Sequence, residues 1–146
     1  HDMTNTIYIH QPEKAVSFTR LPNFLFEAPT FTPLSNEAKV LYAFILRRTE
    51  LSRKNGWADE YGRIYLYYPI CEVVALLHCG RQKAVNTLRE LQYAGLVEIQ
   101  KQGCGKPNRH LPKILWSGSK HRLQEIRLWN AGGLKTALHK YDNQSS

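Results

Sequence analysis

The sequence has few cysteines, few acidic residues and no long apolar run. Its cysteines are Cys71, Cys79 and Cys104, an odd number without a Cys-x-x-Cys pair, which argues against a disulfide scaffold and favours a reducing compartment. No apolar stretch approaches the roughly 20 residues that a membrane-spanning helix needs. We therefore expect a soluble, cytoplasmic protein with no membrane partner.

Catalytic and metal-binding patterns are also missing. The histidines contain no His-hydrophobe-His pair of the kind that holds the metal of a strand-cutting nuclease. Cys71, His78 and Cys79 lack zinc-ligand spacing and a fourth partner, so structural cysteine is the simpler interpretation. The turn at residues 103–106 lacks the full pattern of a phosphate loop. We expect a binding protein that is not an enzyme and needs no cofactor.

Positive charge is what the sequence does contain. Its 146 residues suffice for about one domain, and 20 Lys/Arg against 12 Asp/Glu give a net charge of +8. This excess suggests a polyanion as partner. Between residues 80 and 116 the acids are Glu90 and Glu98, against seven cations: Arg81, Lys83, Arg89, Lys101, Lys106, Arg109 and Lys113.

A short basic helix is expected at residues 81–94. Ala84, Leu88 and Leu91 recur at helical spacing and predict its buried face. Gly80 stands at the N-cap position and Gly95 where a left-handed C-cap is wanted. The outward face should then carry Gln82, Asn86, Arg89 and Glu90, with Lys83 at its edge.

A β-hairpin is expected after this helix. Residues 96–99 have strand composition, Gly103-Cys104-Gly105 allows a turn with positive φ, and the chain from Arg109 onward can pair back.

The preceding elements complete a helix-turn-helix pattern. Ser35 caps a helix that runs through Leu51, residues 63–67 alternate as a strand, and Pro69 opens a second helix at its first position. Arg47, Arg48, Arg53 and Lys54, at the end of the first helix, are interpreted as a solvated terminus in preference to a phosphate site.

The two ends of the chain differ in composition and pattern from residues 34–116. Residues 1–3 resemble an expression remnant, and residues 4–33 form an extension with strand-like stretches at 6–10 and 17–21. The apolar residues of the extension either cap the domain's own core or form the contact of a homodimer. Residues 117–146 read as a linker and a short helical or mobile tail.

These elements predict an α+β fold, a winged helix-turn-helix over residues 34–116 that reads double-stranded DNA. The basic helix would lie in the major groove and the hairpin would be the wing. The expected DNA contacts are Gly80, Arg81, Gln82, Lys83, Asn86, Thr87, Arg89, Lys101, Lys106, Asn108 and Arg109.

The sequence resembles a known family in five segments: 34–42, 51–65, 79–85, 94–98 and 102–108. The combination of Asn55-Gly56-Trp57 with Gly105-Lys106-Pro107-Asn108 is the most specific part of the match. These segments are similar to the N-terminal domain of RepA-type replication initiators of Gram-positive theta-replicating plasmids.

The resemblance implies a DnaD-like winged helix, usually dimeric, that binds repeated origin sequences, or iterons. By position, Arg81, Gln82 and Lys83 match the family's helix start, and residues 106–108 match its wing. Gly80 stands where a capping serine is expected, and Pro112 interrupts the second wing strand. A full initiator would need a further C-terminal domain to reach host replication proteins, so we expect this chain to be a fragment.

Two other functions use the same elements. A transcriptional repressor would bind an operator through the same helix and wing, and a protein-interaction module would bind no DNA. Trp57, Tyr65, Tyr67 and Tyr68 could form a base-stacking platform, but a core position is the simpler interpretation.

Overall fold

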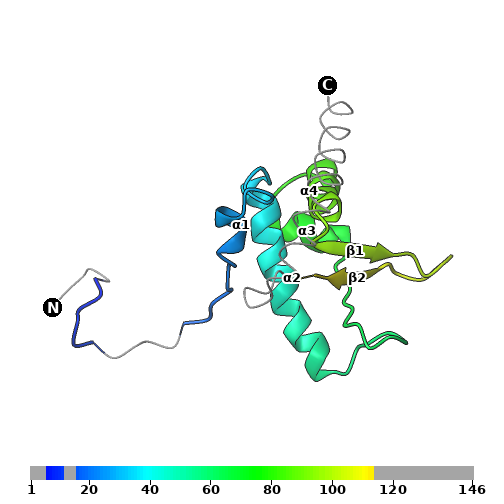
Figure 1. The fold of residues 1–146 in the computed structure, drawn as a ribbon, viewed down its shortest axis with the longest axis horizontal. Helices are drawn as coiled ribbons and strands as arrows, with labels where there is room; N and C mark the ends of the chain where they lie inside the picture. Colours follow the sequence, from blue (N-terminus) through cyan, green and yellow to red (C-terminus); the bar gives the residue numbers. More distant parts are fainter. Residues whose placement is uncertain (1–5, 12–15, 114–146) are drawn as a thin grey trace.

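The computed structural model describes residues 6–11 and 16–113, and the expected remnant at 1–3 and tail at 117–146 lie outside them. The described chain has mixed α and β structure (Figure 1): helices α1 (Phe24–Glu27), α2 (Asn36–Lys54), α3 (Ile70–Leu77) and α4 (Arg81–Tyr93), and strands β1 (Val97–Gln100) and β2 (Arg109–Pro112). Helices α3 and α4 pack on the long helix α2, and the two strands form an antiparallel hairpin beside them. No helix in the described part of the chain is both long and apolar enough to cross a membrane.

Helix α2 begins where the sequence predicts and ends one turn later. The Oγ of Ser35 accepts a hydrogen bond from the backbone N–H of Ala38, which caps the helix. The helix continues beyond Leu51 to Lys54, since cations are favoured at a helix C-terminus. It ends at Asn55, and Gly56 follows with a φ of 72°.

The turn between α3 and α4 agrees with the expected helix-turn-helix. Pro69 is the N-cap of α3, so the helix begins at Ile70, one residue later than predicted. The C-cap of α3 is His78, which has a left-handed φ of 51°. Gly80 is the N-cap of α4, and Gly95 follows the helix with a φ of 74°. Both predicted ends of the basic helix are therefore confirmed.

The strands expected in the N-terminal extension are wrong. Residues 6–10 and 17–21 form no strand, because a β-strand needs a paired neighbour and no strand of the described residues pairs with them. The extension instead contributes α1, and Leu25 and Phe31 lie fully buried in the main core. Phe24 packs edge-on against the rings of Phe31 and Tyr42. The core therefore continues across the expected boundary at residue 34.

The strand expected at residues 63–67 does not form, and the segment makes only two single-residue β-bridges. Ala58 pairs with Ile64 within one loop, and Leu66 pairs with His110 of β2. Leu66 and His110 exchange two backbone hydrogen bonds, of 2.9 and 2.8 Å. One residue of this segment therefore extends the hairpin, and the loop at 55–67 otherwise stands beside it.

His110, a residue of β2, is buried, and we expect its protonation to destabilise the fold. Burial lowers the pKa of His110 below its usual 6.5, and nearby Arg48 adds to the effect. The folded protein thus disfavours the imidazolium, so this site costs no stability above pH 6.5 and destabilises the fold as the pH falls through and below that value.

We expect His110→Leu to abolish this part of the pH dependence. Urea unfolding between about pH 7.5 and 5 should show a steeper loss of stability for the natural chain than for the variant. Parallel curves would show that His110 does not control acid stability. His10→Leu, at an exposed position with an ordinary backbone conformation, is the matched control.

Candidate nucleic-acid interface

Helix α4 presents a basic outward face. Ala84 and Leu91 are fully buried against the core, and Arg81, Lys83 and Arg89 are exposed. Among residues 6–11 and 16–113, none of these three cations has a carboxylate within ion-pair distance. Their charges are therefore available to an external anion.

The N-terminus of α4 adds to this positive face. Gly80 is exposed and has no side chain that could cap the first N–H groups of the helix. No acidic residue lies in the first turn, where it would neutralise the positive end of the helix dipole. The sequence Gly80-Arg81 thus combines free backbone donors with a guanidinium, which suits a phosphate group.

Gln82 and Asn86 form a joined pair on the outward face. The Nε2 of Gln82 donates a 3.0 Å hydrogen bond to the Oδ1 of Asn86. This bond leaves the Gln82 carbonyl oxygen and the Asn86 amide N–H groups free to point outward. Such an acceptor and donor match the N6/N7 edge of adenine in the major groove.

The prediction that Thr87 contacts DNA is wrong. Thr87 is 1% exposed, and its hydroxyl donates a 2.7 Å hydrogen bond to the backbone oxygen of Lys83. The residue lies on the buried side of α4, between Ala84 and Leu91. Its small side chain is accommodated in the core because the hydroxyl is satisfied within its own helix.

The prediction that Glu90 faces solvent is also wrong. Its carboxylate accepts hydrogen bonds from the backbone N–H of Ser35 at 2.9 Å and from the Ser35 hydroxyl at 2.7 Å. Ser35 is the N-cap of α2, so Glu90 ties the basic helix α4 to the start of α2. No local spacing in the sequence signals this bond, because the two residues stand 55 positions apart.

The tip of the β1–β2 hairpin is also exposed and basic. Gly103 and Gly105 have φ values of 108° and 77°, which the turn requires. Lys101, Lys106 and Asn108 are exposed around this turn. Gln102 donates a 2.9 Å hydrogen bond to the backbone oxygen of Pro107 and so braces the tip from within.

Arg109 has a structural contact that the sequence did not reveal. Its guanidinium lies 4.1 Å from the ring centre of Tyr65, and Trp57 stacks on Tyr65 at 6.2 Å. Tyr67 packs edge-on against both rings, and a hydrogen bond from Gln102, with the charge of Arg109, lowers its pKa. Arg109 thus joins the hairpin to the loop at 55–67.

The sequence predicts core positions for Trp57, Tyr65, Tyr67 and Tyr68. Of these four aromatic residues, Tyr68 alone is buried. Tyr68 is buried under the guanidinium of Arg48, whereas Trp57 is 40% exposed. The loop lies outside the main core, so Trp57, Tyr65 and Tyr67 bury part of their surface against one another instead.

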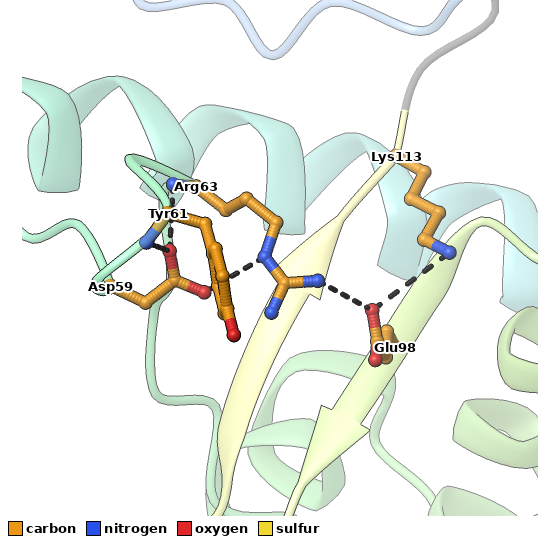
Figure 2. Close-up of polar contacts among 5 residues, drawn as sticks. All are labelled: Asp59, Tyr61, Arg63, Glu98 and Lys113. Atoms are coloured by element: carbon orange, nitrogen blue, oxygen red, sulfur yellow. Dashed lines mark hydrogen bonds and ion pairs between the residues drawn. The ribbon is translucent and has the colours of Figure 1, made fainter.

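A polar network fixes the same loop to β1 (Figure 2). The carboxylate of Asp59 accepts hydrogen bonds from the backbone N–H groups of Tyr61 and Arg63 and from the Arg63 side chain, at 2.8–3.0 Å. Desolvation raises the pKa of Asp59, but these bonds outweigh it and hold the pKa below its usual value. Glu98 lies between Arg63 and Lys113, at 3.6 and 3.9 Å.

The described residues do not bring the cysteines into a metal site. Cys71 and Cys104 are exposed, Cys79 is half-buried, and no three His, Cys, Asp or Glu side chains of residues 6–11 and 16–113 gather around a point that could hold a metal ion.

Comparison with known proteins identifies the family. Residues 17–125 match the family described as the N-terminus of replication initiator protein A, or RepA. The chain belongs to this family. It is also 33% identical over 92 residues to a 41 kDa protein of Lactobacillus helveticus, of which it spans about a quarter, 26% of the length.

Solved structures of related domains share the fold. The N-terminal domain of a DNA-binding protein superposes with a TM-score of 0.62 and 25% identity, over 80% of this chain and 96% of that one. A Rep protein solved in a Rep–DNA complex gives 0.60 and 27%, and a structure described as an MDR initiator gives 0.58 and 32%. Each of these two comparisons covers 76% of this chain and 87% of the other. The resemblance to RepA-type initiators and the mixed helix and hairpin fold are thus confirmed.

Proposed function

We propose that this chain is the origin-binding domain of a plasmid replication initiator and binds double-stranded DNA. The observation that carries the proposal is the outward face of α4, where Arg81, Lys83 and Arg89 have no acidic partner in the described part of the chain. Family membership and the similarity to a Rep protein solved with DNA support it.

The arrangement fits a winged helix-turn-helix. Helices α3 and α4 are the helix-turn-helix, α4 enters the major groove, and the β1–β2 hairpin is the wing. Arg81, Lys83 and Arg89 bind phosphates, whereas Gln82 and Asn86 read base edges. Lys101, Lys106 and Asn108 contact the flanking backbone, and Arg109 supports the wing through Tyr65.

The proposed activity is binding without catalysis or a cofactor. In the cytoplasm, the domain would occupy repeated origin sequences and leave contacts with host replication proteins to other parts of a longer initiator. The repeats are what the resemblance to RepA-type initiators implies. Geometry agrees with more than one binding site, because one recognition helix reads only a few base pairs and cannot specify an origin by itself.

Selection from random DNA duplexes tests this function. The natural chain should enrich a defined motif, and Gln82→Ala with Asn86→Ala should relax preference at one or two positions, since each good base contact contributes about 1–3 kcal/mol of discrimination. Because the two amides are hydrogen-bonded to each other, the double variant should lose little more base discrimination than either single variant. Enrichment of no motif by the natural chain would contradict origin recognition.

We further propose that the domain acts as a homodimer through the first part of its extension. Ile7 and Ile9 are 90% and 93% exposed, unlike Leu25 and Phe31, which belong to the core. An isologous contact of these residues would place two α4 helices on paired half-sites.

Sedimentation of the natural chain should show a dimer, and Ile7→Asp with Ile9→Asp should yield a folded monomer. Thr6→Asp with Gln11→Asp adds the same charge beside them and serves as control. A natural chain that is monomeric both free and on paired half-sites would rule out the dimer.

A further inference from the structure

A basic groove lies apart from the proposed DNA contacts, since no residue of α4 or of the hairpin tip at 101–108 lines it. It has a volume of about 1290 Å³ and lies between residues 18–22, the second half of α2, the loop at 62–64 and the β1–β2 hairpin. No residue of α3 or α4 lines it.

The register of the hairpin explains why the groove is separate. Ile99 pairs with His110, and Ile99 packs on the main core. Glu98 pairs with Leu111, and since neighbouring residues of a strand face opposite sides, this pair lies on the other face of the sheet. Glu98 and Leu111 both line the groove.

The charge of the groove is strongly unbalanced. Its cations are Arg20, Arg47, Arg53, Lys54, Arg63 and Lys113, against the acids Glu50 and Glu98. Both acids are already occupied, Glu98 by Arg63 and Lys113 and Glu50 by Arg53. Among the described residues, Arg20, Arg47 and Lys54 have no carboxylate partner.

The groove also offers apolar surface. Leu46, Ile64 and Leu111 line it together with Phe18, which is 77% exposed. Arg47 holds the segment that carries Phe18 beside α2, through hydrogen bonds to Thr19 and Ser17 of 3.2 and 3.3 Å. The volume exceeds the roughly 300–1,000 Å³ of a typical small-molecule site, so a chain segment is the better match.

From this combination we infer that the groove docks an acidic peptide segment with apolar anchors, supplied by a partner protein. Carboxylates would pair with Arg20, Arg47 and Lys54, and the anchors would cover Phe18 and Leu46. A DNA backbone would satisfy the cations but would leave the apolar surface uncovered. Because the groove excludes α4, the peptide and DNA bind at the same time.

Charge reversal on the two surfaces tests this assignment. The probe is a short fluorescein-labelled peptide that alternates glutamate pairs with leucine or phenylalanine, and the readout is its anisotropy with the full chain. Arg20→Glu with Lys54→Glu should weaken peptide binding by about tenfold or more and change duplex affinity by less than about threefold. Lys83→Glu with Arg89→Glu, the same change of charge on α4, should do the reverse.

Every other outcome overturns the inference. Equal loss of peptide binding in both variants would show attraction by net charge only. Loss of duplex binding in the groove variant would assign the groove to DNA, and a changed sedimentation coefficient without loss of peptide binding would assign it to a second copy. Phe18→Ser provides the apolar check, because a docked anchor predicts weaker peptide binding at unchanged charge.

Discussion

Arg81→Gln with Lys83→Gln should lower the affinity for duplex DNA about a hundredfold. Each exposed cation at the start of α4 would lose one charge-assisted phosphate contact of about 1.5 kcal/mol, and about 1.4 kcal/mol corresponds to tenfold in affinity. The log–log slope of affinity against salt should become shallower by about 1.8, or 0.9 per phosphate contact. Fluorescence anisotropy over a salt series measures both quantities.

The fold should survive this change. Neither side chain has an ion-pair partner in the described chain, and both are exposed. Arg20→Gln with Lys54→Gln removes the same charge from the groove and is the matched control. Equal weakening by both pairs would mean that DNA senses only net charge, and α4 would then lose its assignment as the recognition helix.

Glu90→Ala should lower the free energy of unfolding by about 2–3 kcal/mol. The substitution removes both hydrogen bonds to Ser35 and leaves the backbone N–H of this half-buried residue without its protein partner. Urea unfolding measures the loss. Glu50→Ala, which removes an exposed pair with Arg53, should change stability by less than about 0.5 kcal/mol.

A double-mutant cycle separates the tie between α2 and α4 from ordinary helix capping. Ser35→Ala by itself should cost about 1 kcal/mol through the lost cap of α2, because the Glu90 carboxylate can still accept from the backbone. The double variant should cost less than the sum of the single ones. Strict additivity would show that Glu90 does not hold α4 through Ser35.

The family and the basic helix could be derived from the sequence because their signals are local. Gly80 and Gly95 mark the ends of α4, Ser35 marks the start of α2, and Ala84 and Leu91 mark a buried face by spacing alone. The paired glycines at 103 and 105 likewise predict the hairpin turn, since L side chains rarely adopt a positive φ. The exposed cations of α4 follow from the same periodicity.

Tertiary structure decided everything that depends on a distant partner. A strand pattern at residues 6–10 forms no strand without a neighbour to pair with, and the pattern at 63–67 pairs with β2 at Leu66 alone. From the sequence, Glu90 is predicted to be an exposed acid, but in the structure α2 brings Ser35 within hydrogen-bond distance of it. Arg109 is predicted to be an exposed cation, but the loop places the ring of Tyr65 under its guanidinium. Backbone conformation is set by neighbouring residues, whereas burial and hydrogen-bond satisfaction are set by whichever segment the fold brings into contact.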